Sequence, residues 1–499
     1  MNPNFIEDLL AEQRVLTPVV RFSEEHDREG NALEGTYRDL IPLSAPRPGE
    51  QYAFEVDLDR CTGCKACVAA CHSLNGLEDN ESWREVGRLT GMGNGPAIVQ
   101  TVTTACHHCE DPGCANGCPV LAYEKDPLTG IVRHLDDQCI GCQYCIMKCP
   151  YEVPKYSKRL GIVRKCDMCH DRLAEGEAPA CVQACPTSAI AIRVVSTAET
   201  KARAEAGVFL PDSPDPLITL PTTRYVSAQP LPDTLRAADH SFPTVQPGHT
   251  PLVFMLVFTQ AGVGLLLASL AQRDPGPWLL AASLFTVVGL NASVLHLGQP
   301  LKAWRAFLGW RKSWLSREII ALGMFGGALV SATGLVLIDR HLPAWSGLLP
   351  ASLVDLVLAG AACTGLLGVL CSAWVYHDTR RRVWRGFRSF GRFFWSTSLF
   401  AIYPALPFLL GAKLCWEAWL SRPYPHGLKQ RISEDLKRSS QLQWGPLRRW
   451  TIARFALGCL SIAVFFISIP VALGLALVGE LVERSLFFRA GVATRMPGS

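Results

Sequence analysis

Sixteen of the twenty cysteines in this 499-residue chain lie between residues 61 and 185, in four groups of four. So many thiols in one stretch restrict the fold more than any other feature, because each must be bound to metal, oxidised or buried. The groups are CTGCKACVAAC (Cys61, Cys64, Cys67, Cys71), CHHCEDPGCANGCP (Cys106, Cys109, Cys114, Cys118), CIGCQYCIMKCP (Cys139, Cys142, Cys145, Cys149), and CDMC followed by CVQACP (Cys166, Cys169, Cys181, Cys185).

The spacing within these groups indicates iron–sulfur ligands. The first and third groups match the bacterial run C-x2-C-x2-C-x3-C, and the third adds the following proline. In that run, three thiolates on a tight loop bind one cubane and the fourth reaches a neighbouring cluster. The second group widens one gap and the fourth inserts a loop, but both keep the final C-x3-C-P. Sixteen thiolates therefore predict four [4Fe–4S] clusters.

Zinc and disulfides are the alternatives for dense cysteines. Zinc sites rarely need a third cysteine two residues after a C-x2-C pair. The start of the chain, MNPNFIEDLLAEQ, has no basic segment followed by an apolar run and no twin-arginine pair. We therefore expect no export by a signal of its own, a setting that favours metal ligands over disulfides. His107 and His108 could suggest Rieske-type ligation, but the complete cysteine count favours ordinary loop residues.

Cluster sharing between groups follows the rule of two-cluster ferredoxins. Spacing alone does not fix which groups pair. The adjacent second and third groups are expected to pair, and the first and fourth then pair across them. This predicts a first set (Cys61, Cys64, Cys67, Cys185), a second set (Cys71, Cys166, Cys169, Cys181), a third set (Cys106, Cys109, Cys114, Cys149) and a fourth set (Cys118, Cys139, Cys142, Cys145). The alternative is that each group binds its own cluster.

The sequence changes character near residue 250. Residues 1–249 carry 23 Lys and Arg against 34 Asp and Glu, whereas residues 250–499 carry 25 against 10. Such an asymmetry indicates regions with different surroundings. We expect an N-terminal lead-in (1–50), a cysteine-rich domain (51–195), an extended Pro-rich linker (196–250) and a membrane region (251–499) with about six helices.

Six apolar runs in the membrane region approach the roughly 20 residues that cross a bilayer. They are Leu252–Gln272, Pro277–Leu297, Ile319–Ile338, Ser352–Tyr376, Phe393–Ala412 and Ile452–Val478. Buried core helices are the alternative, but six such runs separated by basic loops favour spans. The fifth run is the least regular, because Pro404 and Pro407 would kink it.

The four-group pattern over about residues 52–195 resembles the electron-transfer subunit of dimethyl sulfoxide reductase-type molybdoenzymes. The segment SVLHLGQPLKAWRAFLGWRKSWLSREI (293–319) is similar to the His-Leu-Gly-x-Pro signature of their membrane anchor, and GELVERSLFF (479–488) resembles its closing motif. The chain thus looks like two fused subunits. Anchors of this family often have eight spans rather than six, and residues 1–50 have no counterpart.

The resemblance implies an α+β, double ferredoxin-like domain with four clusters, followed by an all-α polytopic transmembrane bundle. It also implies a separate molybdopterin-containing catalytic subunit that carries the terminal reductase activity. The chain itself would be a subunit of an oxidoreductase complex. The alternative is a self-contained, quinone-coupled membrane redox module with a soluble ferredoxin partner, but no pterin, flavin or nicotinamide fingerprint supports it. No nucleic-acid partner is expected.

A membrane region tied to an electron carrier needs a lipid-soluble donor, and we expect quinol from the quinone pool, as menaquinol. Haem would need paired histidines inside the bundle, and His296, His341, His377 and His426 lie in loops or at run ends, so none is expected. His296, Glu318 and Asp378 are predicted at the cluster-side boundary, as is Glu480. The first three are the candidate quinol site, because quinol oxidation needs proton acceptors. His296 also matches the family's His-Leu-Gly motif; the alternative is an interfacial helix cap.

The orientation in the bacterial cytoplasmic (inner) membrane follows from the basic loops. Residues 298–317 and 377–392 are basic and are predicted on the side of the cluster domain, which places that domain in the cytoplasm. With six spans, the basic segment 421–451 falls on the opposite side and argues weakly against this orientation. Well-known members of the family face the periplasm instead.

Overall fold

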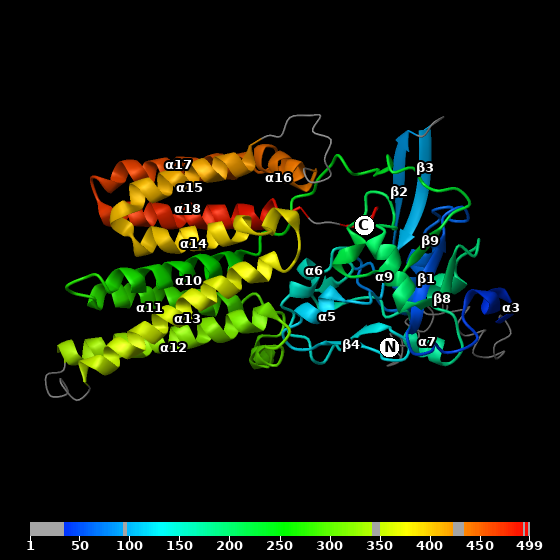
Figure 1. Ribbon diagram of the computed structural model, residues 1–499, viewed down its shortest axis with the longest axis horizontal. Coiled ribbons are helices and arrows are strands. Elements are labelled where there is room, and N and C mark those ends of the chain that lie inside the picture. The colour runs from blue at the N-terminus through cyan, green and yellow to red at the C-terminus, as the bar shows by residue number, and fades with distance from the viewer. Residues whose placement is uncertain (1–33, 93–96, 342–349, 423–433, 493–494, 498–499) are drawn as a thin grey trace, which may run out of the picture.

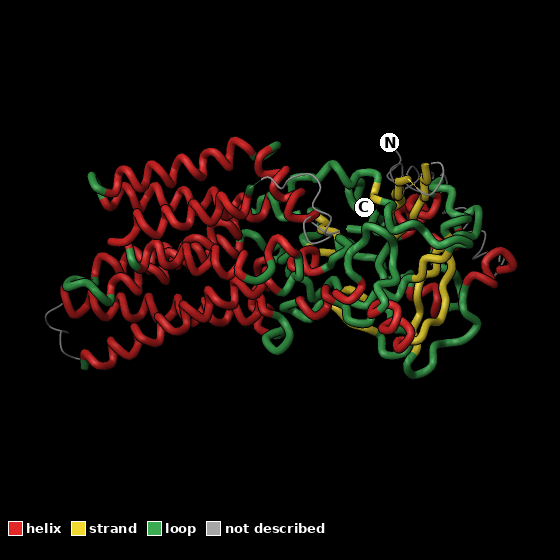
Figure 2. The backbone as a smooth tube through the Cα atoms, turned by 45° about the horizontal axis from the view of Figure 1, so that its top comes forward, coloured by secondary structure: helices red, strands yellow, loops and turns green. Residues whose placement is uncertain are grey.

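The computed structural model describes residues 34–92, 97–341, 350–422, 434–492 and 495–497. These residues form two lobes, which lie end to end in Figure 1. The cysteine lobe comprises the described residues up to 249, and the helical lobe begins with residue 250. Figure 2 shows the long helices gathered in one lobe and the strands in the other, as the α+β and all-α expectation requires.

Two three-stranded sheets frame the cysteine lobe. The first has the order β8-β1-β9, with β8 antiparallel and β9 parallel to the central strand. The second has the order β10-β2-β3 and is antiparallel. Their bounds are Glu50–Asp57 (β1), Glu85–Met92 (β2), Ala97–Thr104 (β3), Ile190–Ser196 (β8), Arg224–Val226 (β9) and Arg236–Ala237 (β10). Both faces of β1 are covered at its middle, where the consecutive residues Ala53 and Phe54 are buried on opposite sides.

Two short hairpins and five short helices carry the cysteine loops between those sheets. The hairpins are β4–β5 (Tyr123–Lys125, Val132–His134) and β6–β7 (Lys155–Ser157, Ile162–Arg164). The helices are α4 (Ala66–Leu74), α5 (Gly113–Gly117), α6 (Tyr144–Lys148), α7 (His170–Ala174) and α8 (Ala180–Gln183). The repetition of loop, helix and hairpin is the ferredoxin-like arrangement expected from the sequence.

The linker and the described part of the lead-in belong to the fold of the cysteine lobe, and residues 1–33 of the lead-in lie outside the described residues. In the lead-in, α3 (Glu34–Tyr37) and η1 (Arg38–Leu40) carry Tyr37, which is buried in the core of the cysteine lobe. The linker contains α9 (Thr197–Glu205) and η2 (Pro216–Ile218), and it supplies β9 and β10 to the two sheets. The boundaries at 50 and 195 therefore cut through one folded unit.

The helical lobe contains eight helices of at least fifteen residues among those described. They are α10 (Thr250–Ser269), α11 (Gly276–Val294), α12 (Trp314–His341), α13 (Ala351–His377), α14 (Phe387–Ala401), α15 (Leu406–Ser421), α17 (Arg448–Phe465) and α18 (Ile469–Arg489). The four from α10 to α13 are long and apolar enough to cross a membrane, and α14 with α15 raises that number to five if the bent pair is one span.

Two of the six predicted spans differ from the structure. The fifth run bends by 106° between α14 and α15, where η5 (Tyr403–Ala405) holds Pro404 and Pro407 begins the new helix. The sixth run is broken after Phe465 and resumes at Ile469, next to Pro470. Proline fits the first turn of a helix but not its interior, so each run makes two helices rather than one.

The extra reversal between α14 and α15 moves the described residues of the segment 421–451 to the side of the cysteine lobe, contrary to the six-span prediction. Helix α16 (Glu434–Trp444) follows α15 there, and Trp444 Nε1 donates to the Ser421 carbonyl at 2.7 Å. Arg438 of α16 hydrogen-bonds His240 of the linker. The basic segment therefore lies on the same side as the other two basic loops (Figure 1).

The C-terminal tail returns to the cysteine lobe after α18. The backbone N–H of Gln246 in the linker donates to the Arg489 carbonyl at 3.0 Å, so tail and linker run together. Met496 is 1% exposed and packs with Val56 and Leu58 in the core of the cysteine lobe. The cysteine lobe is thus held by both the linker and the end of the chain.

Candidate functional site

The cysteines of the cysteine lobe gather in four places. Cys61, Cys64, Cys67 and Cys185 line one small cavity. Cys106, Cys109, Cys114 and Cys149 line another. The thiols of Cys71, Cys166, Cys169 and Cys181 act on one another electrostatically, as do those of Cys118, Cys139, Cys142 and Cys145. Two of the four predicted sets therefore line common cavities, and the sharing of ligands between clusters stays a prediction.

Local backbone geometry turns the thiols of each loop inward. Gly141 has φ +70°, a value that glycine adopts without strain, and it sits between Cys139 and Cys142. Gln143, with φ +61°, then begins α6, whose first turn presents Cys145. The glycine of the C-x-G-C sequence therefore allows the reversal that brings three cysteines of the motif around one point.

The buried thiols suit metal ligation, because a bound metal takes the place of the thiol protons. Burial raises the pKa of Cys118 and Cys149 to about 11 and that of Cys169 to about 12, so these thiols are protonated near neutral pH without metal. Iron binds the thiolate form and displaces the proton. Among the described residues, no three His, Cys, Asp or Glu side chains are arranged around a single ion. Sets of four thiols around a common space suit a multi-iron cubane.

His107 and His108 occupy core positions. His107 is 1% exposed, bonds Thr223 Oγ1 through Nδ1 at 2.9 Å and packs edge-on against Tyr151. His108 Nδ1 accepts from the Val132 N–H at 3.1 Å. Burial lowers the pKa of both imidazoles, that of His107 to about 3. Both histidines therefore connect backbone and side chains inside the lobe in neutral form.

The fourth set faces the helical lobe. The loop after α11 lies on its cysteine motif, where the Gln299 N–H donates to the Ile140 carbonyl at 3.1 Å. Further along, the Gly309 N–H donates to the Pro119 carbonyl at 2.8 Å, and Ser313 Oγ donates to the Gly117 carbonyl at 2.7 Å. The segment that contains the His-Leu-Gly-x-Pro sequence is therefore the docking loop for the motifs around Cys118 and Cys142.

Three glycines allow that loop to approach so closely. A Cβ atom added at Gly298 would overlap the Gly161 carbonyl oxygen, and one at Gly141 would lie 2.8 Å from the Gly298 nitrogen. Real Cβ atoms do not come this near to backbone, so any side chain here would separate the lobes. The glycine of the anchor motif is thus explained by the junction.

His296 lies beside the fourth set at the end of α11. Its imidazole lies close to the Cys142 backbone, and its ring contacts that of His249 with centroids 5.2 Å apart. Its Nε2 is buried and has no protein partner among the described residues. Burial lowers the pKa of His296, and burial together with the neighbouring His296 and Arg381 lowers that of His249 to about 4.

Glu318 and Asp378 lie near the same junction but differ in their surroundings. Glu318 is 3% exposed and accepts a hydrogen bond from Ser372 of α13. Asp378 is paired with Lys148 of the cysteine motif, whose Nζ is 2.7 Å from Asp378 Oδ2 and 2.8 Å from its carbonyl. Glu318 is thus the enclosed carboxylate, whereas Asp378 also joins the two lobes.

Four junction residues were missed by sequence reasoning. Tyr144 is 2% exposed and donates to the Val375 carbonyl at 2.8 Å, and Arg381 Nε donates to the Met147 carbonyl at 3.2 Å. Lys148 and His249 are the other two. A lysine inside the CIMKC motif was the available signal, because nothing in iron ligation requires a cation there.

Glu480 does not belong to this junction. It accepts from Lys413, and its Oε1 is 2.8 Å from Arg454 Nη2. Arg454 also holds Glu417 through two bonds of 2.8 and 2.9 Å. This network of buried charges connects α15, α17 and α18, so it lies inside the bundle rather than at its boundary.

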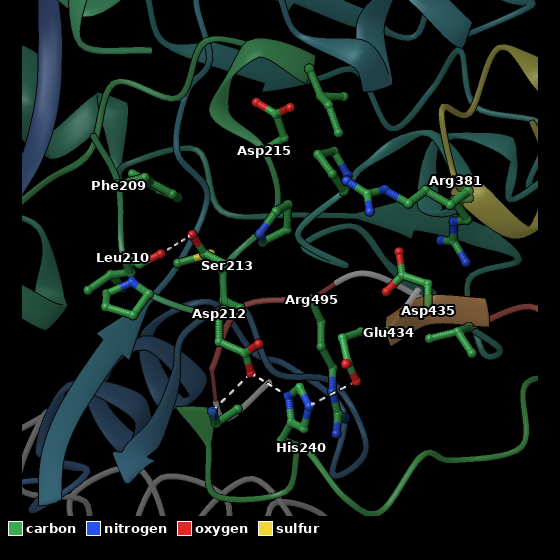
Figure 3. A pocket seen from close by; sticks show the side chains of 18 of the residues that line it. Phe209, Leu210, Asp212, Ser213, Asp215, His240, Arg381, Glu434, Asp435 and Arg495 are labelled. Atoms are coloured by element: carbon green, nitrogen blue, oxygen red, sulfur yellow. Dashed lines mark hydrogen bonds and ion pairs between the residues drawn. The ribbon is translucent and has the colours of Figure 1, made fainter. Parts of the chain in front are cut away.

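A polar cavity opens where linker, helical lobe and C-terminal tail meet (Figure 3). His240 lies between Asp212, at 2.8 Å, and Glu434, at 3.8 Å. Arg381 and Asp435 face each other across another part of the cavity (Figure 3). Cations and carboxylates alternate here, so the cavity has no dominant charge.

Comparisons with known proteins match both lobes. Residues 52–73 match a 4Fe-4S binding domain, residues 98–195 a 4Fe-4S dicluster domain, and residues 247–401 the DMSO reductase anchor subunit (DmsC). The B subunit of the anaerobic dimethyl sulfoxide reductase of Escherichia coli K12 is 41% identical over 148 residues, which are 28% of this chain and 72% of the relative.

Two further relatives match the same region. The corresponding B subunit from Haemophilus influenzae is 36% identical over 168 residues, or 32% of this chain and 82% of the relative. The iron–sulfur subunit of the nitrate-inducible formate dehydrogenase of Escherichia coli K12 is 35% identical over 184 residues, or 31% and 61%. The chain therefore belongs to the family of dimethyl sulfoxide reductase iron–sulfur electron-transfer subunits, here joined in one polypeptide to a membrane anchor of the DmsC type.

Proposed function

We propose that this chain oxidises a quinol, menaquinol, at the junction of the two lobes and delivers the electrons to a molybdopterin-containing catalytic partner of the dimethyl sulfoxide reductase type. Clusters held by the four cysteine sets would supply one-electron carriers between these points. The terminal reduction takes place in the partner. Two of the three relatives described above are subunits of anaerobic dimethyl sulfoxide reductases, which supports the identity of that partner.

The observation that carries this proposal is the position of His296. A half-buried imidazole, whose Nε2 is buried without a partner among the described residues, lies just after a candidate span and close to the backbone of Cys142, a predicted cluster ligand. A buried polar atom without a partner is costly and points to a missing hydrogen-bonding group. A quinol hydroxyl at this place would be next to the fourth set, so electrons would not need to cross the bilayer.

Oxidation of a quinol to a quinone releases two electrons and two protons. In the proposed site, His296 accepts the hydrogen bond of one hydroxyl and takes its proton, since a neutral imidazole is a suitable base. Glu318 and Asp378 are the further acceptors, with Glu318 enclosed and Asp378 shared with Lys148. Tyr144 closes the site toward the cysteine lobe.

The test is the replacement of His296 by Gln. Quinol-dependent reduction of the iron–sulfur chromophore should be lost, while dithionite still reduces it fully and iron content is unchanged. His341→Gln is the matched control, because His341 is exposed at the far end of α12. A variant that oxidises a menaquinol analogue at the rate of the unaltered protein would contradict the role of His296.

We further propose that the cysteine lobe faces the cytoplasm. Three basic segments, 298–317, 377–392 and 434–449, all lie at its end of the bundle, which the positive-inside rule assigns to the cytoplasm. Ile467, at the opposite end, is 85% exposed. With Ile467→Cys, a membrane-impermeant maleimide should label intact spheroplasts; labelling only in inverted vesicles would reverse the orientation.

A further inference from the structure

Two cations are buried in the cysteine lobe without a carboxylate partner. Arg84 is 2% exposed and Lys165 is 3% exposed. Neither forms an ion pair with any residue that the structure describes. An unpaired charge inside a protein is strongly unfavourable unless another charge compensates it. Compensation here must come from the sulfur ligands and what they bind.

Arg84 lies between the first and second sets. Its Nη1 donates to Thr103 Oγ1 at 3.2 Å, and that hydroxyl is 3.6 Å from the sulfur of Cys67. Its Nη2 is buried without a partner among the described residues. Cys181 of the second set and Cys67 of the first are the thiols that act on it most. The guanidinium therefore faces both sets at once.

Lys165 lies between the second and third sets. Its ammonium donates to the carbonyl of Cys166, a ligand of the second set, at 2.8 Å, and to the carbonyl of Val132. Lys165 also lines the cavity formed by Cys106, Cys109, Cys114 and Cys149. Its long stem thus carries one positive charge to the boundary of two neighbouring sets.

The boundary between the third and fourth sets has no such cation among the residues described there. Instead, the hydroxyl of the half-buried Tyr123 lies buried close to Cys145, Cys114 and Cys118, and desolvation raises the pKa of this phenol, so it stays neutral. From the first set to the fourth, the first two boundaries therefore each hold a buried cation, and the third holds a neutral phenol. Of the four sets, the second, Cys71 with Cys166, Cys169 and Cys181, is the one that has one of these two cations on each side.

We infer that Arg84 and Lys165 raise the reduction potentials of the clusters beside them, and that the cluster of the second set has the highest potential of the four. The inference rests on the proposed four-cluster arrangement. Reduction adds one electron and no proton, so the cluster becomes more negative and a fixed neighbouring cation stabilises the reduced form. Asp167 opposes this effect, but its side chain is 34% exposed and lies 3.7 Å from His170.

The expected consequence is that the most easily reduced cluster lies in the middle of the electron path. An electron entering at the fourth set, next to the membrane, would come to rest on the second set before it reaches the first. The first set then passes it to the partner, and Cys64 of that set is exposed at the surface. Arg84 and Lys165 would therefore be tuning residues, although neither binds iron.

The test is a pair of neutral variants, Arg84→Met and Lys165→Met, in the full-length membrane protein. Anaerobic titration with dithionite and mediators, followed by electron paramagnetic resonance, should show two signals shifted to lower potential in each variant. One signal, that of the second set, should shift in both. We expect about a tenfold change in the ratio of reduced to oxidised cluster at a given potential, about 59 mV for a one-electron couple.

Exposed cations and charge-keeping substitutions provide the controls. Arg88 lies on β2, four residues after Arg84, and Lys158 lies in the β6–β7 hairpin; both are exposed, so Arg88→Met and Lys158→Met should shift nothing. Arg84→Lys and Lys165→Arg keep the charge and should restore the potentials, which a purely structural role would not predict.

Iron analysis separates this inference from the four-cluster proposal. Unaltered protein with clearly fewer than sixteen iron atoms per polypeptide would reject the four-cluster arrangement itself. Full iron content with unshifted signals in both Met variants, or with two separate pairs of shifted signals and none in common, would reject the tuning role. If a Met variant loses iron, the charge-keeping variants decide: shifted potentials in these variants also reject it.

Discussion

Both lobes bury charged side chains, but they compensate the charges differently. In the helical lobe, cations and carboxylates pair with each other: Lys413 and Arg454 with Glu480, and Arg392 with Glu483. In the cysteine lobe, Arg84 and Lys165 have no carboxylate among the described residues. The difference shows that this network of the helical lobe balances its charges within the polypeptide, whereas Arg84 and Lys165 of the cysteine lobe depend on a negative group that the lobe binds.

The surroundings explain this difference. Helices in a bilayer gain little from hydrophobic burial, so polar contacts and close packing hold them together. The network of Glu417, Arg454 and Glu480 joins three helices in this way. In the cysteine lobe the clusters of apolar core side chains are small, because thiols and loop backbone fill part of the interior.

Metal removal should have the largest effect, and it should show that the stability of the cysteine lobe depends on bound metal whereas that of the helical lobe does not. The purified protein should contain about sixteen iron and sixteen acid-labile sulfide per polypeptide. Chelation under oxidising conditions should unfold the cysteine lobe, because its unpaired cations lose their compensation, while the bundle stays helical. Limited proteolysis and circular dichroism measure this. Substantial zinc with little sulfide, or a protease-resistant apo lobe, would contradict it.

A single ligand should have a smaller and more local effect. Cys142→Ser removes one thiolate of the fourth set, so one cluster signal should be altered or lost and the other three should remain in electron paramagnetic resonance spectra. Quinol-dependent reduction should fall steeply, because the altered site is the one next to His296. Cys459→Ser is the control, since Cys459 stands alone on α17. Loss of all signals would mean that the fold had failed.

Breaking a buried pair tests how far the helical lobe depends on its internal charges. Arg454→Met removes the cation that Glu417 and Glu480 share and leaves these two buried carboxylates with Lys413, so one negative charge is uncompensated, which should lower the free energy of unfolding by about 3–5 kcal/mol. Unfolding in detergent, followed by helix content, measures this, and iron content should not change. Arg449→Met, at an exposed position of the same helix, is the control. A loss of iron before helix would show that the lobes are not independent.

The smallest expected effect is at the junction. Gly298→Ala places a methyl group against the Gly161 backbone, and overpacking of this kind costs about 1–3 kcal/mol. Both lobes should stay folded while electron entry from quinol slows. Gly323→Ala is the matched control, because a Cβ there meets nothing within 4 Å. Equal rates for the two variants would show that the junction tolerates a wider separation.

The iron–sulfur domain could be predicted from the sequence because iron ligation constrains the spacing of cysteines over a few residues. The last two spans could not, because an apolar run has the same composition whether it forms one helix or two. Lys413 and Arg454 inside those runs were the signal that the runs packed against each other. The strand pairing of β9 with β1 was also inaccessible, since it joins Glu55 to Arg224 across a long stretch of sequence and depends on the finished lobe.

The C-terminal tail places Met496 in the core of the cysteine lobe, so the two lobes are joined covalently by the linker and non-covalently by the tail. A protease cut anywhere in the linker would therefore leave the lobes held together by the tail and the junction. In the uncut chain the linker keeps the lobes close together, so the tail and the junction meet their binding surfaces at a high local concentration that dilution does not lower. Two separately encoded subunits would lack this linker, so they would need a tighter non-covalent interface to stay together.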